Sequence, residues 1–76
     1  MNLDARVNIL IIGCGKIAKT HAHILNKINV RLGFYSKTKS SADNLALNFR
    51  DSKVFTSWEE VKNDCEFETW LLCSPP

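Results

Sequence analysis

The sequence predicts an α/β domain with an incomplete, doubly wound parallel sheet and the element order βαβαβαβ. Four short apolar runs alternate with segments of helical periodicity. The first run, Val7–Ile12, is apolar on both faces, which is typical of a central parallel strand covered by helices on both sides. A glycine turn, Gly13-Cys14-Gly15, follows it directly. Right-handed crossovers around this turn predict the strand order 3-2-1-4.

The glycine turn is also the strongest functional signal. Gly13 permits a sharp turn, and Gly15 lets the backbone approach a ligand closely. The N–H groups that begin the next helix, at Lys16 and Ile17, favour an anion such as a pyrophosphate. With Ala18 as the third small residue, the pattern matches the Gly-x-Gly-x-x-Gly/Ala dinucleotide fingerprint. The alternative is a tight turn that binds nothing.

The turn leads into a predicted helix that ends at Asn29. Its apolar stripe consists of Ile17, Ala18, Ile24, Leu25 and Ile28. This spacing is typical of a helix packed on a sheet. His21 lies on the same stripe. It either approaches the cofactor or a neighbouring domain, or it is a packed histidine with a satisfied ring nitrogen.

The second predicted strand, residues 30–35, contains Gly33, which indicates close approach to a neighbour. It ends at Ser36-Lys37-Thr38-Lys39, about twenty residues after the glycines. In the dinucleotide fingerprint, an Asp or Glu at this place accepts hydrogen bonds from the ribose hydroxyls of NAD. Two hydroxyls and two lysines stand here instead, and these groups suit the 2′-phosphate of NADP. The alternative is a solvated polar loop.

A second helix and a third strand follow. Ser40 or Ser41 is the predicted N-cap of this helix. Its buried stripe consists of Ala42, Leu45, Ala46 and Phe49. A turn then leads into a third strand over residues 53–56.

The last helix and strand are short. Ser57 and Glu60 match a capping box, which predicts a helix from Trp58 to about residue 64. Residues 69–73 form a fourth strand that is apolar on both faces. Since no segment after Pro76 pairs with its far edge, we expect self-association or a missing domain to cover it.

Composition and charge limit the classes of molecule that the protein is expected to bind. The 76 residues make one domain at most. Residues 1–39 carry seven Lys and Arg against one acid, and the other half carries three basic and seven acidic side chains. The basic half contains the glycine turn, which suits an anionic small molecule. The basic residues form no run, which argues against nucleic acid.

The sequence also bears on membranes, metals and location. No apolar run is long enough to span a membrane, and no signal-peptide pattern precedes the first strand. The three cysteines, Cys14, Cys65 and Cys73, lack CxxC spacing. Free thiols in the cytoplasm are therefore expected, without a zinc site.

Residues 13–22, Gly-Cys-Gly-Lys-Ile-Ala-Lys-Thr-His-Ala, resemble the opening of the Gfo/Idh/MocA oxidoreductases, whose N-terminal domain is a Rossmann fold. Residues 54–61 look like the third strand and short helix of this family, and residues 70–76 like its fourth strand. The resemblance covers nearly the whole chain. It implies a nicotinamide cofactor, with Ser74 and Pro75 beside the nicotinamide. A pyrroline-carboxylate type of reductase fits less well.

The chain departs from the family in two ways. Ser36 stands where the family has an acid, which favours NADP over NAD. The family's Glu-Lys-Pro segment, its Asp/His region and its substrate domain would lie beyond Pro76. The chain therefore carries no predicted catalytic residue. The predicted cofactor-binding residues are Gly13, Cys14, Gly15, Lys16, Ile17, Ser36, Lys37, Thr38, Ser74 and Pro75.

These observations lead to one main interpretation and two alternatives. Residues 1–76 are interpreted as the N-terminal, dinucleotide-binding fragment of an oxidoreductase, separated from its C-terminal substrate domain. The full enzyme would transfer hydride between NADP or NAD and a small sugar-like or polyol-like substrate. The alternatives are a non-catalytic nucleotide-binding or sensing module, and the product of a truncated gene.

Overall fold

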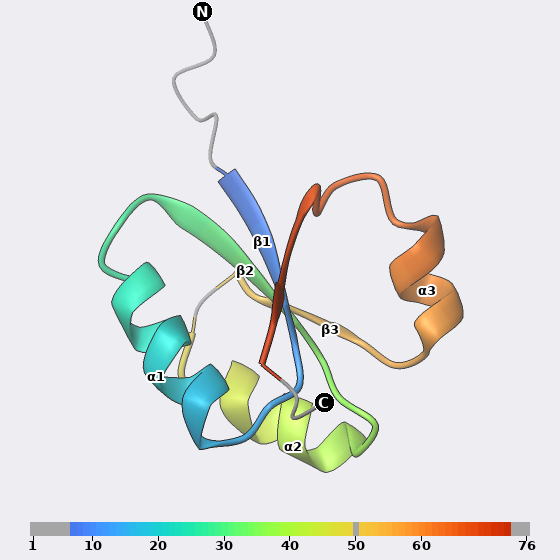
Figure 1. The fold of residues 1–76 in the computed structure, drawn as a ribbon, viewed down its shortest axis with the longest axis horizontal. Coiled ribbons are helices and arrows are strands. Elements are labelled where there is room, and N and C mark those ends of the chain that lie inside the picture. Colours follow the sequence, from blue (N-terminus) through green and yellow to red (C-terminus); the bar gives the residue numbers. More distant parts are fainter. Residues whose placement is uncertain (1–6, 50, 74–76) are drawn as a thin grey trace, which may run out of the picture.

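The computed structural model describes residues 7–49 and 51–73. Its elements, in chain order, are β1 (Val7–Ile12), α1 (Lys16–Leu25), β2 (Val30–Tyr35), α2 (Lys39–Ala46), β3 (Lys53–Phe55), α3 (Trp58–Asn63) and β4 (Thr69–Leu72). The strands form one parallel sheet in the order β3-β2-β1-β4 (Figure 1). Both the βαβαβαβ order and the strand order 3-2-1-4 predicted from the sequence are confirmed. Within the described residues, no helix is long and apolar enough to cross a membrane.

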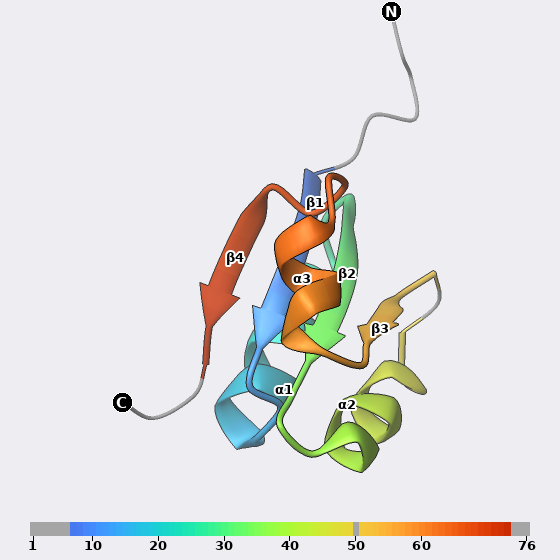
Figure 2. The same ribbon diagram turned by 90° about the vertical axis from the view of Figure 1, so that its right-hand side faces the viewer.

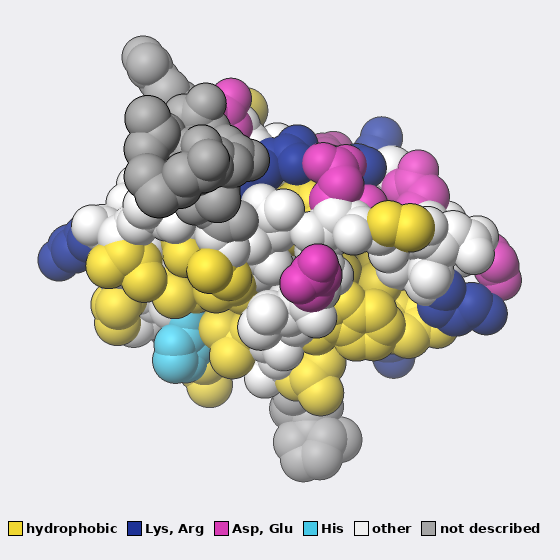
Figure 3. Space-filling model, turned by 90° about the horizontal axis from the view of Figure 1, so that it is seen from above, with side chains coloured by type: hydrophobic (Ala, Val, Ile, Leu, Met, Phe, Trp, Pro, Cys, Tyr) yellow, Lys and Arg dark blue, Asp and Glu magenta, His cyan; other side chains and the backbone are white. Residues whose placement is uncertain are grey.

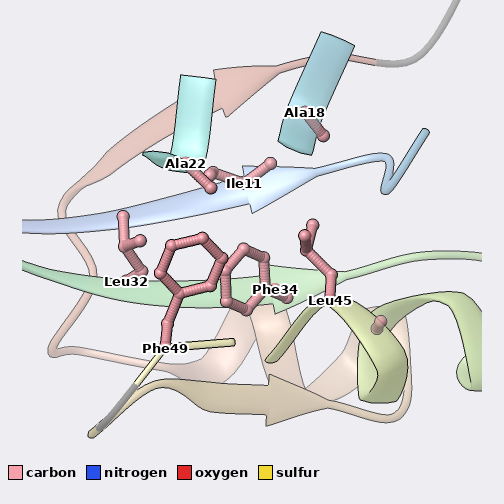
Figure 4. Close-up of a cluster of buried hydrophobic side chains, with 8 residues drawn as sticks. Ile11, Ala18, Ala22, Leu32, Phe34, Leu45 and Phe49 are labelled. Atoms are coloured by element: carbon pink, nitrogen blue, oxygen red, sulfur yellow. The ribbon is translucent and has the colours of Figure 1, made fainter. Parts of the chain in front are cut away.

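Helices pack on both faces of the sheet (Figure 2). On one face, α1 and α2 enclose a cluster around Phe34, which is fully buried and lies 5.7 Å from the Phe49 ring (Figure 4). On the other face, α3 contributes Val61 to a smaller cluster in which Phe55 and Phe67 meet edge to face at 5.6 Å. β1 supplies alternate residues to the two clusters, so it is the central strand that its apolar sequence predicts.

Helix α1 differs from its prediction in length and in the face that it buries. It ends at Leu25, and the backbone then tightens, with the N–H of Ile28 donating to Leu25 O at 3.0 Å. Ala18 and Ala22 are its fully buried residues (Figure 4). Small side chains let a helix lie close to a sheet, which leaves the bulkier residues outside. The predicted buried stripe is therefore wrong at Ile17, Ile24 and Ile28, which are 57–63% exposed.

His21 lies on this outer side and is exposed. The interpretation of a packed histidine is therefore wrong. Its side chain also does not line the cleft described below.

Helix α2 begins earlier than predicted. Thr38 is its N-cap residue, in place of Ser40 or Ser41, and its side chain makes no cap hydrogen bond. Just before it, Ser36 Oγ accepts a hydrogen bond from the Thr38 N–H at 3.2 Å, so the chain already turns at Ser36. The predicted burial of Ala42, Leu45 and Phe49 is confirmed, with Ala46 half-buried.

Helix α3 has the predicted N-cap at Ser57, but the Glu60 side chain bonds the residue before the cap and not the cap itself. Ser57 Oγ accepts from the Glu60 N–H at 3.2 Å, and Glu60 Oε1 accepts from the Thr56 N–H at 2.7 Å. β3 ends at Phe55, one residue before the predicted end, and the N–H of Thr56 bonds the Glu60 side chain instead of a strand. The helix thus starts at a fixed point next to the end of β3.

The amino ends of the strands are joined by ion pairs. Arg31 pairs with Glu66 at 2.8 Å, and its guanidinium lies over the Phe67 ring at 5.3 Å. Lys53 Nζ lies 3.6 Å from Asp64 Oδ1. The other carboxylate oxygen, Asp64 Oδ2, accepts a hydrogen bond from the Phe67 N–H at 2.7 Å. Figure 3, which views this end, shows basic and acidic side chains next to one another. These contacts hold the segment that leads from α3 into β4.

Phe67 explains the glycine inside β2. Its ring lies directly against Gly33, where an added Cβ would come within 3.0 Å of Phe67 Cε2 and 3.2 Å of Leu10 Cδ1. The close approach to a neighbour that Gly33 predicts is confirmed, and the neighbour is this ring.

Candidate functional site

A cleft of about 650 Å³ lies at the carboxyl ends of the strands. β1 and β2 both end there, and α1 and α2 begin there (Figure 2). It is lined by Ile12, Gly13, Cys14, Gly15, Tyr35, Ser36, Lys37, Trp58 and Cys73. The connection from β1 leads to β2 on one side, whereas β4 pairs with β1 on the other side. The cleft therefore lies at the topological switch point, where open α/β sheets bind ligands.

The glycine turn forms the floor of this cleft. Gly13 has φ 96°, a conformation that side chains other than glycine rarely adopt, and its N–H donates to Tyr35 O at 2.8 Å. Gly15 has φ −88°, which any residue adopts. A Cβ added to Gly15 would meet no atom within 4 Å. The space beside Gly15 is thus open to a ligand.

Helix α1 directs free backbone donors towards this space. Its first hydrogen bond joins the Lys19 N–H to Gly15 O at 3.1 Å, so the N–H groups of Lys16, Ile17 and Ala18 have no acceptor within the helix. No acidic residue lies in its first turn to offset the positive end of the helix dipole. Donors and dipole together suit an anionic group next to Gly15.

Among the predicted side chains, Lys16 and Ile17 do not line the cleft. Lys16 borders a second hollow of about 380 Å³ between α1 and α2, together with Lys19 and Ser41. The Ile17 side chain is 63% exposed. Neither residue is part of the cleft lining, and both lie beside it in the first turn of α1.

The end of β2 supplies the polar wall. Ser36 is half-buried and Lys37 is exposed, and both line the cleft. Thr38 is exposed and does not line it. No Asp or Glu stands among the described residues that line the cleft. Ser74 and Pro75, predicted beside the nicotinamide, lie outside the described residues.

Two thiols, Cys14 and Cys73, also line the cleft. Burial and the neighbouring Cys73 raise the pKa of Cys14 to about 11, and burial raises the pKa of Cys73 as well. Both thiols are therefore uncharged at neutral pH and do not repel an anion. Among residues 7–49 and 51–73, no group of three or more His, Cys, Asp or Glu is placed to hold a metal ion.

Sequence reasoning missed four of the residues that line the cleft, namely Ile12, Tyr35, Trp58 and Cys73. Trp58 opens α3, directly after the turn that follows β3. In a parallel sheet, the connections that follow neighbouring strands lie at the same edge. The aromatic residue that follows the third predicted strand, Trp58, could therefore have been expected to line the same cleft as the glycine turn.

Comparisons with known proteins identify the fold. No family model matches the sequence, and a search of curated proteins found no match. Among solved structures, the chain is similar to the crystal structure of a myo-inositol dehydrogenase from Corynebacterium glutamicum ATCC 13032, with a TM-score of 0.81 and 20% identity. The match covers 93% of this chain but 22% of that chain. The resemblance predicted from the sequence is confirmed at the level of the fold.

Proposed function

We propose that residues 1–76 are the N-terminal, dinucleotide-binding domain of an oxidoreductase that uses a nicotinamide cofactor. The observation that carries the proposal is the open space at Gly15, towards which the free N–H groups of α1 are directed. A glycine at the N-terminus of a helix lets a pyrophosphate approach the backbone closely, because it has no side chain in the way. The likeness in fold to a myo-inositol dehydrogenase supports the oxidoreductase class and a sugar-like or polyol-like substrate.

In this proposal, the chain binds and orients the cofactor, which supplies the hydride chemistry when bound. The N–H groups of Gly15, Lys16 and Ile17 hold the pyrophosphate. Ser36 and Lys37 bind the ribose at the end of β2, with the Thr38 hydroxyl at its outer side. The uncharged Cys14 thiol lets the phosphates approach. Ser74 and Pro75 are proposed to border the nicotinamide because of the family resemblance.

We propose further that NADP is preferred to NAD. Ser36 donates a hydroxyl and Lys37 a positive charge, and the described lining contains no carboxylate to repel a 2′-phosphate. A hydrogen bond to a charged group contributes about 1.5–3 kcal/mol, which is roughly tenfold or more in affinity. We expect Ser36→Asp to shift the preference towards NAD by about this factor, measured by calorimetric titration with NADPH and NADH.

The control for this shift is Ser40→Asp, which adds the same charge on α2 at an exposed position that does not line the cleft. It should leave the ratio of the two affinities unchanged. Tighter binding of NADH than of NADPH by the unmutated protein would contradict the preference.

We also propose that a second copy or a further domain of the protein covers the outer edge of β4. Trp70 and Leu72 are 44% and 71% exposed on this strand. Unpaired backbone groups beside exposed apolar side chains favour association.

We expect residues 1–76 alone to self-associate, and Leu72→Lys to reduce the mass measured by light scattering. Leu47→Lys, at an 84% exposed position after α2, is the control and should not reduce it. A stable monomer that oxidises NADPH with a carbonyl substrate would contradict this proposal.

A non-catalytic nucleotide-binding or sensing module is the second candidate. It rests on the same cleft, because a fold that binds a dinucleotide does not by itself decide whether the dinucleotide reacts. Dinucleotide binding without turnover by the full-length protein would support it. A cytoplasmic location is proposed for either function, supported by the free thiols of Cys14, Cys65 and Cys73.

A further inference from the structure

Trp58 is placed where an aromatic ring can serve a ligand. It lines the cleft together with Ser36 and Lys37, and its side chain is 42% exposed. Its place in the cleft lining, and not its exposure alone, distinguishes it from other partly exposed aromatic residues such as Trp70. Part of the Trp58 ring is left open towards the cleft.

The ring is held in place by its neighbours. Its centroid lies 5.9 Å from that of Tyr35 and 5.5 Å from that of Trp70, within the range of favourable aromatic pairs. The backbone beneath it is fixed by the hydrogen bond from the Glu60 N–H to Ser57 Oγ and by Val61, which is 1% exposed. A ring held in this way loses little freedom when a ligand stacks on it.

The position of the Trp58 ring indicates which part of a bound dinucleotide it would contact. Tyr35, its neighbour, directly precedes Ser36, the residue proposed to bind the ribose that carries the 2′-phosphate. In NADP this ribose bears the adenine base, and the nicotinamide is attached at the far side of the pyrophosphate. If Ser36 binds that ribose, the base on it would lie on the side of the cleft that Trp58 also lines.

We propose that Trp58 is the surface on which the adenine base of the cofactor stacks, which makes it a residue that contributes affinity for the adenosine half. This inference rests on the proposed function and adds the contact that recognises the base. Stacking of a base on an aromatic side chain is sequence-tolerant and strong, and its loss weakens binding roughly ten- to a hundredfold.

The test compares two probes, each containing one half of the cofactor. Trp58→Ala should weaken NADPH and adenosine 2′,5′-bisphosphate by the same factor, roughly ten- to a hundredfold in calorimetric titrations. Binding of nicotinamide mononucleotide should not change, because this probe lacks the adenine base. Trp58→Phe keeps an aromatic face and should restore most of the affinity, and circular dichroism checks that both variants stay folded.

Fluorescence gives a second, independent measurement, because the chain contains two tryptophans. In Trp70→Phe, the remaining Trp58 emission should be quenched by adenosine 2′,5′-bisphosphate. In Trp58→Phe, the remaining Trp70 emission should change little. Equal NADPH affinity in folded Trp58→Ala and unmutated protein would overturn this inference and leave the proposed function standing. No binding of either dinucleotide by the unmutated protein would instead overturn the proposed function.

Discussion

Replacing Gly15 by valine is expected to weaken dinucleotide binding by at least about a hundredfold, or ~2.7 kcal/mol, without unfolding the protein. The Cβ at this position meets no atom of the chain within 4 Å, and φ of −88° suits any residue, so the fold tolerates it. The side chain would fill the space beside the free N–H groups of α1, where the pyrophosphate is proposed to lie. Calorimetric titration with NADPH measures the loss.

Thr20→Val is the matched control. It places a valine on the same helix at an exposed position that does not line the cleft, and it removes one hydrogen bond, from Thr20 Oγ1 to Lys16 O at 3.2 Å. Its NADPH affinity should equal that of the unmutated protein. If Gly15→Val keeps its affinity while folded, the pyrophosphate does not bind at this turn.

Gly33→Val is expected to lower the free energy of unfolding by about 1–3 kcal/mol, the usual cost of an overpacked core. The added Cβ would lie 3.0 Å from Phe67 Cε2 and 3.2 Å from Leu10 Cδ1, and both neighbours are buried. Neither can move away without disturbing the packing of β1 or of the segment before β4. For so small a domain, this is a large share of its stability.

Urea unfolding measures this effect, with Gly15→Ala as the control. Both substitutions add carbon atoms at a glycine, but the one at Gly15 enters open space. It should therefore change the unfolding midpoint much less than Gly33→Val does. An unchanged midpoint in Gly33→Val would mean that the contact with Phe67 is not tight.

The sequence predicted the features that local chemistry determines. β1 was evident because a run that is apolar on both faces suits a strand packed on both sides, and both core clusters include its residues. The sharp turn was evident because Gly13 adopts a positive φ that other residues avoid. The α3 start was evident because Ser57 is an N-cap residue, and its hydroxyl accepts the Glu60 N–H.

The features that packing determines were not predictable in the same way. The periodicity of α1 gave a broad apolar face, and only the depth of contact with the sheet decides that Ala18 and Ala22 are buried while Ile24 is exposed. The start of α2 depends on a hydrogen bond between Ser36 and the Thr38 N–H, which competes with capping by Ser40. The position of Trp58 in the cleft depends on the path of the connection from β3 through α3 to β4, which runs from one edge of the sheet to the other.

Titration of isotope-labelled protein with NADPH, followed by the backbone amide signals in NMR spectra, shows directly whether a nicotinamide dinucleotide binds at the turn between β1 and α1. We expect saturable shifts at Gly15, Lys16 and Ile17, whose N–H groups are proposed to hold the pyrophosphate. Saturable shifts confined to other residues, or the absence of any saturable shift, would contradict binding at this turn.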